Sequence, residues 1–208
     1  MSLDNSLIVI ESQNKKFLTV IKTDEEFITN DGKISYNEIK SLPSTVISST
    51  GKEFYIYTPS YKEFVLLMRR GPQIIYPKDV GSIIVEANIN NNSSVLEIGT
   101  GSGALTLFLI LIIGKNGKVF SIDSEKKNQF RAKKTIERYV SSFSKEFEYN
   151  LELIHSELIN ISFNKISENI DTIITDVPEP WEFFNNNKIE KDIMWVSYLP
   201  SISQVEKL

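Results

Sequence analysis

The sequence predicts an α/β protein in which a small β-rich module precedes a mostly parallel sheet. Three observations predict it. Short apolar stretches separated by turn sequences occupy residues 1–58, apolar strands alternate with helices from residue 78 on, and a glycine-rich turn follows the first of those strands. Alternation of this kind implies crossover connections and parallel strands. We therefore expect two domains, over residues 1–58 and 59–208.

The N-terminal module shows hairpin and turn patterns. Two apolar stretches, Leu7–Ile10 and Phe17–Ile21, are separated by polar residues, which predicts a hairpin. Asn-Asp-Gly at 30–32 and Ser-Thr-Gly at 49–51 predict tight turns. We expect the last strand of the module at Phe54–Tyr57, which is rich in residues that favour strands.

The remaining elements alternate along the chain. Apolar residues at helical spacing mark the helices, and short apolar runs mark the strands. We expect helices over 61–70, 79–87, 104–113 and 125–140, and strands over 94–98, 118–123, 151–154, 171–176 and 192–198. This order predicts a parallel sheet.

The composition excludes several classes of protein. Hydrophobic residues make up 41% and charged residues 24% of the 208 residues, as in ordinary globular proteins. With no cysteine and one histidine, a disulfide framework, a metal cluster and a Ser-His-Asp triad are disfavoured. No apolar run approaches the ~20 residues that span a bilayer, and no secretory signal is apparent. We expect a cytoplasmic protein that binds no metal and no membrane.

The most informative segment is Val-Leu-Glu-Ile-Gly-Thr-Gly-Ser-Gly-Ala at residues 95–104. Glycines at 99, 101 and 103 let a ligand approach main-chain N–H groups without a Cβ in the way. Open α/β sheets bind nucleotides at such places, beyond the carboxyl ends of strands. A dinucleotide fingerprint has the spacing Gly-x-Gly-x-x-Gly, whereas here Glu97 is followed by evenly spaced glycines. This pattern resembles motif I of the S-adenosylmethionine (SAM) methyltransferases.

Acidic residues follow the next strands. Asp123 ends the strand after the glycine loop; it can accept the two hydroxyls of a ribose, or it can cap the following helix, at about 1 kcal/mol. Glu157 can accept the amine of an adenine, or it is an ordinary exposed residue. Asp176 precedes a loop with two prolines and Trp181, and it can accept a hydrogen bond or a proton from a substrate amine.

Basic and aromatic residues raise the question of nucleic acid. In the segment 69–79, Tyr76 can stack on a base and the arginines can bind phosphate, or the segment is a linker with Pro77 in the first turn of the next helix. A net charge of −4 argues against general nucleic-acid binding but not against a local basic patch. A second run forms either such a patch or a solvated helix face: Lys126, Lys127, Arg131, Lys133 and Lys134.

Three motifs in order resemble one family. They are Arg-Arg-Gly-Pro-Gln-Ile-Ile-Tyr-Pro-Lys-Asp at 69–79, Leu-Glu-Ile-Gly-Thr-Gly-Ser-Gly-Ala-Leu-Thr at 96–106 and Asp-Val-Pro-Glu-Pro-Trp at 176–181. Together they resemble the tRNA (adenine-58-N1)-methyltransferases, catalytic-subunit type and archaeal branch, over about residues 30–200. The resemblance implies a class I Rossmann-like methyltransferase fold, SAM as cofactor, a tRNA substrate and a homotetramer.

The resemblance also implies the roles of individual residues. The SAM site would comprise Gln73, Ile74, Ile75, Tyr76, Glu97, Gly99, Thr100, Gly101, Ser102, Gly103, Asp123, Glu157 and Asp176. The glycine loop would contact the methionine part, Asp123 the ribose and Glu157 the adenine. Asp176 and Tyr76 are the implied catalytic residues. Asp176 would bind the amine of a target adenine that has left its stack, with Tyr76 beside the base. The methyl acceptor would be N1 of adenine 58 in the T-loop, with position 57 open as a second target.

Two other hypotheses stay open. Members of the family usually continue after the fifth strand with a helix and an antiparallel pair of strands, which we expect to be missing here, leaving an uncovered strand edge. One alternative is therefore a shortened, non-catalytic tRNA-binding subunit, although such a subunit would be expected to lose its glycines. The other is a class I methyltransferase for a small molecule or a protein, which would lack the motifs at 69–79 and 176–181.

Overall fold

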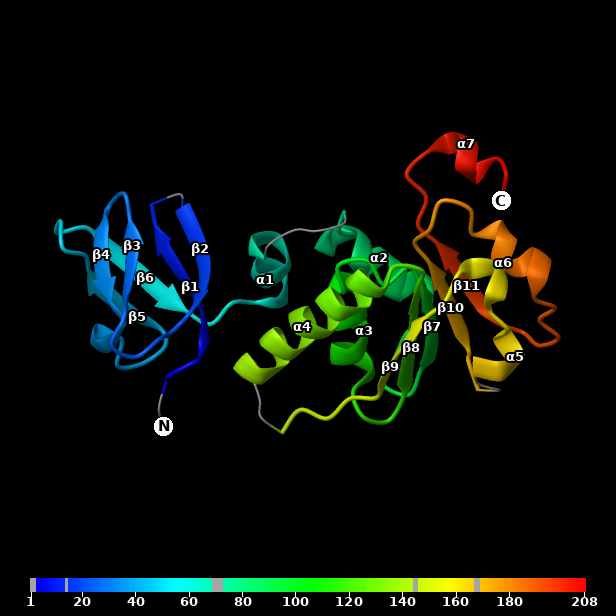
Figure 1. Cartoon of the computed structure of the whole chain (residues 1–208), viewed down its shortest axis with the longest axis horizontal. Helices are drawn as coiled ribbons and strands as arrows, with labels where there is room; N and C mark the ends of the chain where they lie inside the picture. Colours follow the sequence, from blue (N-terminus) through cyan, green and yellow to red (C-terminus); the bar gives the residue numbers. More distant parts are fainter. Residues whose placement is uncertain (1–2, 14, 69–72, 144–145, 167–168) are drawn as a thin grey trace. The chain divides into compact units, whose positions relative to one another are not determined.

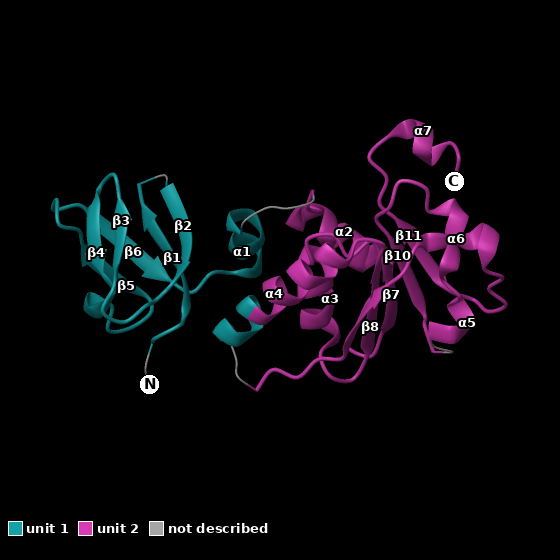
Figure 2. Ribbon diagram, viewed as in Figure 1, with its two compact units in different colours: residues 1–69, 138–145 teal, residues 70–137, 146–208 magenta. Residues whose placement is uncertain are grey.

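The structure is a computed structural model that divides into two compact units (Figure 2). One consists of residues 1–69 and 138–145, and the other of residues 70–137 and 146–208. The structure describes residues 3–13, 15–68, 73–143, 146–166 and 169–208.

The first unit is built on a four-stranded sheet of order β2-β1-β6-β5, in which every neighbouring pair is antiparallel. Its strands are β1 (Leu7–Ser12), β2 (Lys15–Val20), β5 (Ser44–Ile47) and β6 (Glu53–Tyr57), and the separate hairpin comprises β3 (Glu26–Thr29) and β4 (Gly32–Ser35), which the 3-10 turn η1 (Tyr36–Glu38) follows. The pairing of β1 with β2 confirms the predicted hairpin. The two predicted turns join β3 to β4 and β5 to β6.

Helix α1 (Tyr61–Leu67) closes the first unit with a capping box. The Ser60 side chain accepts a hydrogen bond from the Glu63 backbone N–H, and the Glu63 carboxylate accepts one from the Ser60 backbone N–H. Lys16 and Tyr57 donate to the same carboxylate at 2.8 and 2.7 Å. Burial opposes the ionisation of Glu63, but these hydrogen bonds outweigh it and lower its pKa to about 2. One carboxylate thus ties α1 to two strands.

The second unit contains a five-stranded sheet of order β11-β10-β7-β8-β9, and all its neighbouring pairs are parallel. Its strands are β7 (Ser94–Ile98), β8 (Lys118–Asp123), β9 (Leu151–His155), β10 (Thr172–Thr175) and β11 (Met194–Ser197). The helices are α2 (Pro77–Glu86), α3 (Ala104–Ile113), α4 (Lys126–Phe143), α5 (Phe163–Ile166), α6 (Trp181–Asn186) and α7 (Ile202–Val205), with the 3-10 turn η2 (Leu158–Asn160). The end of α4, from residue 138 on, belongs to the first unit. The predicted α/β class is confirmed.

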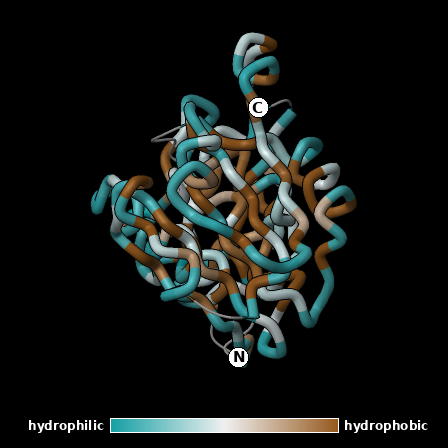
Figure 3. The backbone as a smooth tube through the Cα atoms, turned by 90° about the vertical axis from the view of Figure 1, so that its right-hand side faces the viewer, coloured by the Kyte–Doolittle hydropathy of each residue, from teal (hydrophilic) through white to brown (hydrophobic). Residues whose placement is uncertain are grey.

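Helices cover both faces of this sheet. Figure 1 shows α2, α3 and α4 on one face and α5 and α6 on the other. Because both faces are covered, β7, β8 and β10 are apolar runs with almost no exposed residue. Helix α3 is apolar around its whole circumference, as expected of a buried helix. Hydrophobic segments accordingly gather in the interior, and hydrophilic segments form most outer loops (Figure 3).

Element bounds follow the predictions most closely at the centre of the sheet. The bounds of β7, α3 and β8 are those predicted, whereas β10 and β11 are shorter, because their pairing runs only from Thr172–Met194 to Thr175–Ser197. The predicted end of the helix over 61–70 falls partly on residues 69–72, which lie outside the described residues. Among the helices that the structure describes, none is long and apolar enough to cross a membrane.

The strand order creates a crevice between β7 and β10. The chain passes from β7 to β8 and β9 on one side, then returns to β10 and β11 on the other. The loops after β7 and β10 therefore leave the sheet in opposite directions. In open α/β sheets ligands bind at this switch point, beyond the carboxyl ends of the strands.

Candidate active site

A cavity of about 440 Å³ lies at this switch point. Its walls come from the segments that follow the carboxyl ends of β7, β8, β9 and β10, together with Gln73 from the segment before α2. The volume is within the range of small-molecule sites.

The glycine loop forms the floor between β7 and β10. Gly99 has a φ of +104°, and a Cβ at this position would collide with the backbone oxygen of Asp176. Gly103 has a φ of +78°, and its Cβ would come within 2.7 Å of Ala132 on α4. At both positions glycine is therefore required for two reasons, the positive φ and the close contact with a neighbouring segment. A ligand at this floor meets bare main chain.

Asp123 organises the wall beside the loop. Its carboxylate accepts hydrogen bonds from the backbone N–H of Gly101 at 2.9 Å and of Glu125 at 2.8 Å, and from the Asn128 amide at 3.2 Å. The bond from Glu125 fixes the turn that leads into α4, which begins at Lys126. Asp123 also lines the cavity. The side chain therefore supports the local turn and faces the space where a ligand would bind.

Glu97 lies behind the loop instead of in the cavity wall. It is 1% exposed, and its Oε2 accepts hydrogen bonds from Ser121 at 2.5 Å and from Thr106 at 2.6 Å. Burial raises the pKa of Glu97 to about 8 against the effect of these hydrogen bonds, and the charges of Asp176 and Asp123 add to the rise. Burial thus favours the protonated, neutral form of Glu97, and its hydrogen bonds join β7, β8 and α3.

Asp176 is held at the opposite wall by its backbone. Its N–H donates to the carbonyl of Ile98 at 2.8 Å, which places it directly across from Gly99. No hydrogen bond to its carboxylate is found within the described parts of the chain, and burial raises its pKa to about 6. A half-buried carboxylate without a partner at the end of a strand is suited to bind a polar group of a ligand.

Carboxylates dominate the polar lining. Asp123, Glu157, Asp176, Glu179 and Glu182 all line the cavity, and none of its described lining residues is basic. This charge fits SAM, which carries a positive sulfur and an ammonium group, because unlike charges attract strongly in a partly buried site. The apolar part of the lining is suited to a flat base: Ile98, Ile122, Leu158 and Ile161.

The structure brings together part of the residue set expected from the sequence. Gln73, Gly99, Gly101, Asp123, Glu157 and Asp176 line the cavity. The other expected residues do not line it: Ile74, Ile75, Thr100 and Ser102 are buried, Gly103 is the N-cap of α3, Glu97 is behind the loop, and Tyr76 is 41% exposed at the N-cap of α2. Arg69 and Arg70 lie outside the described residues.

Several residues that line the cavity were not predicted from the sequence. Asn128 belongs to a helix segment rich in basic residues, and only its position in the first helical turn after Asp123 indicates that it could lie at the site. Leu158, Ile161 and Glu179 lie in or beside short turns after β9 and β10, and Glu182 lies in the first turn of α6, so their positions depend on tertiary packing.

The parallel sheet, the glycine loop and the acidic cavity at the switch point define a class I SAM-dependent methyltransferase. Within this class, the family model for the tRNA methyltransferase complex GCD14 subunit matches residues 54–208. The chain belongs to this family, which confirms the resemblance found in the sequence.

Individual relatives agree with this assignment. A tRNA (adenine(57)-N(1)/adenine(58)-N(1))-methyltransferase of Methanocaldococcus jannaschii is 32% identical over 96% of this chain and 77% of its own length. A tRNA (adenine(58)-N(1))-methyltransferase of Thermus thermophilus is 26% identical over 100% of this chain and 80% of its own.

Two solved structures have the same fold. The tRNA (m1A58) methyltransferase of Aquifex aeolicus superimposes with a TM-score of 0.76 at 27% identity, covering 98% of this chain and 78% of that one. A SAM-dependent O-methyltransferase of Thermotoga maritima reaches 0.87 at 22% identity, covering 98% and 75%, and supports the fold alone.

Replacing Gly99 by alanine is expected to lower SAM affinity more than about tenfold and to destabilise the protein by about 1–3 kcal/mol, because the new Cβ would push the ends of β7 and β10 apart. Calorimetric titration with SAM and thermal unfolding measure the two effects. Gly114→Ala is the control: Gly114 also has a positive φ but has open space around it, at the far end of α3. It should lose stability and keep SAM affinity. Normal SAM binding by Gly99→Ala would contradict the assigned floor.

Proposed function

We propose that this protein is a SAM-dependent methyltransferase that modifies N1 of adenine 58 in the T-loop of tRNA. The observation that carries the proposal is the acidic switch-point cavity in a chain of the GCD14 family, with the Asp176 carboxylate, which has no hydrogen-bond partner among the described residues, at its wall. The names of its relatives in Methanocaldococcus and Thermus support the choice of nucleoside and atom. Methylation of position 57 as well is a further outcome that the assay below distinguishes.

The chain holds the cofactor with residues that line the cavity. Gly99 and Gly101 present main chain to it, and Asp123, whose carboxylate is fixed by Gly101 and Asn128, is placed to accept the ribose hydroxyls. Glu157 is placed to accept the adenine amine, and Gln73 to cover the site. SAM supplies a methyl group on a positively charged sulfur, which is a strong electrophile. The protein's task is mainly to position the acceptor.

Asp176 orients the acceptor base. Adenine N1 already carries a lone pair, so no strong base is needed to activate it. The ionised Asp176 carboxylate accepts a hydrogen bond from the exocyclic amine, which turns N1 towards the cavity, and it stabilises the positive charge that the base acquires on methylation. Tyr76 is assigned the role of stacking on the base that has left the T-loop; its exposed ring at the N-cap of α2 supports this.

The direct test is incubation with labelled SAM and unmodified tRNA, followed by identification of the methylated nucleoside and its position. We expect 1-methyladenosine at position 58. Transcripts in which position 57 or 58 is replaced by another nucleotide serve as controls, and loss of the product with the 58 variant is expected. SAM binding without any incorporation into intact tRNA would contradict catalysis and favour a non-catalytic subunit. Transfer of the labelled methyl group only to protein or to small molecules would favour a class I methyltransferase with such a substrate.

The rate should depend on the ionisation of Asp176. Because burial raises its pKa to about 6, the ionised fraction grows as the pH rises through 6. We expect kcat/KM to increase about tenfold per pH unit below that value and to level off above it. The Asp176→Asn variant should lose this rise of kcat/KM with pH, and its kcat/KM should be lower by roughly 100-fold or more. Its SAM affinity, measured separately, should change little. An equal loss of SAM binding and turnover would instead assign Asp176 to the cofactor site.

We further propose that the chain forms a homo-oligomer, a tetramer as the family resemblance implies, and that it acts on tRNA in the cytoplasm. The description of the family as a subunit of a complex supports assembly. Size-exclusion chromatography with light scattering should give a mass above that of one 23.8 kDa chain. A mass of one chain at all concentrations would contradict the assembly.

A further inference from the structure

The exposed face of α4 carries charged and aromatic side chains that the cavity does not use. Gln129, Ala132 and Ile136 are buried and fix which side of the helix faces inward. Residues three and four apart share a helix face. The opposite side therefore carries Lys127, Phe130, Arg131 and Lys134, with Lys126 next to it.

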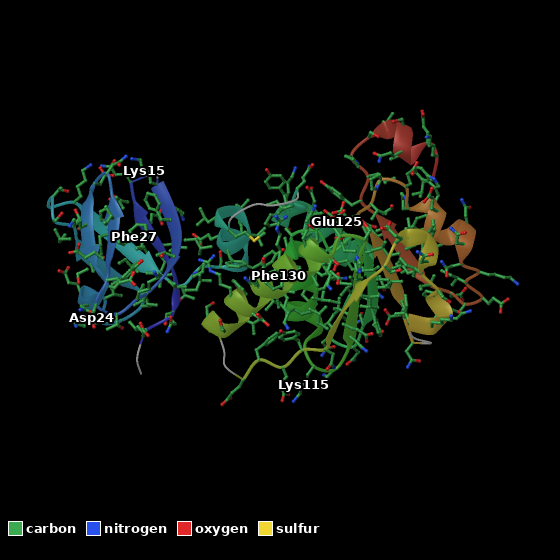
Figure 4. The ribbon with its side chains drawn as sticks, viewed as in Figure 1. Lys15, Asp24, Phe27, Lys115, Glu125 and Phe130 are labelled. Carbon is green, nitrogen blue, oxygen red and sulfur yellow. The ribbon has the colours of Figure 1, made fainter. Side chains whose placement is uncertain are left out.

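The exposure of the Phe130 ring is not expected of a helix face that contacts only solvent. The Phe130 side chain, labelled in Figure 4, is 59% exposed. The Lys134 ammonium lies 4.3 Å from the centre of its ring. Such a cation–π contact gives the lysine a preferred place over one part of the ring. The remainder of the exposed ring is available for contact with another molecule.

Most of the positive charge on this face is not neutralised. Lys127 pairs with Glu125 at 3.0 Å. Lys126, Arg131 and Lys134 make no ion pair with any part of the chain that the structure describes. Three cations without an ion pair among the described residues therefore form a local basic patch on this helix, in a protein whose net charge is −4.

The patch begins beside the cavity. Asp123 and Asn128 line the cavity, and α4 starts between them. A helix rises 1.5 Å per residue, so Lys134 lies about 12 Å along the axis from Lys126. The cavity itself is lined by carboxylates, which repel phosphates, so a polyanionic substrate needs its phosphate contacts outside it. Helix α4 supplies cations at a suitable place.

We propose that Lys126, Phe130, Arg131 and Lys134, here called the α4 basic face, bind the tRNA backbone outside the cavity, on the side of the Asp123 wall. The cations contact phosphates, and Phe130 packs on a ribose or an unstacked base. This inference rests on the proposed function, because it assigns a binding surface for that substrate. A helix face that only contacts solvent would explain the charged residues but not the exposed aromatic ring.

The test measures tRNA affinity over a series of salt concentrations, separately from methyl transfer. The double variant Arg131→Gln with Lys134→Gln should raise the Kd at least fivefold. It should also make the negative slope of log K against log salt shallower by about 1.5, since each lost phosphate contact removes about 0.7–0.9 from its magnitude. Phe130→Ala should raise the Kd about fivefold or more through lost stacking and leave the slope unchanged. SAM affinity should stay the same in all variants, which also reports intact folding.

The matched control removes two positive charges elsewhere. Lys115, labelled in Figure 4, and Lys118 lie at the amino end of β8, opposite the cavity. They pair with Glu148 and Glu152. Lys115→Gln with Lys118→Gln should bind tRNA like the parent protein. An equal loss of affinity in the control, or no loss in the α4 variants, would overturn the inference.

The results separate this inference from the proposed function. If the parent protein methylates tRNA and the α4 variants bind tRNA normally, only the role of the α4 basic face is overturned. Parent protein that binds tRNA without methylating it contradicts the proposed function, and the α4 variants still decide the inference. Absence of any salt-dependent tRNA binding by the parent protein overturns both.

Discussion

The site depends on the close approach of two strand ends, which is possible because residue 99 has no Cβ. The backbone oxygen of Asp176 lies too close to the position of a Cβ on Gly99 for a side chain to fit there, while the Asp176 N–H donates to the carbonyl of Ile98. This contact closes the floor of the cavity and sets the position of the Asp176 carboxylate. The switch in strand order provides the crevice, and the missing Cβ determines its depth.

A second constraint is electrostatic. Several carboxylates lie around one cavity, and their mutual repulsion and burial favour the protonated form of some of them. For Glu97, which is fully enclosed, burial favours the protonated form, and its hydrogen bonds link β7, β8 and α3. Asp123 is instead held by N–H donors. Asp176 lies between these cases, because its pKa is raised and its carboxylate has no hydrogen-bond partner among the described residues, so it can respond to a bound cation or amine.

In the proposed function, helix α4 takes part in binding both the cofactor and the tRNA. The helix follows a turn held by Asp123 and contributes Asn128 to the acidic cavity, whereas its exposed face is basic and aromatic. Separation of opposite charges on one element lets a cationic cofactor and an anionic polymer bind near each other. The helix period makes this possible, because residues 128 and 130 point in different directions.

The order of strands and helices, the parallel class and the glycine loop could be predicted from the sequence, because buried parallel strands and apolar helices leave strong local patterns. The family could also be predicted, since its motifs are contiguous. Local pattern could not show that Glu97 is enclosed while Glu179 and Glu182 line the cavity. Whether a carboxylate contacts a ligand or holds a strand depends on packing between segments far apart in the chain. Only the tertiary structure decides this, because desolvation and hydrogen-bond partners are set by those distant contacts.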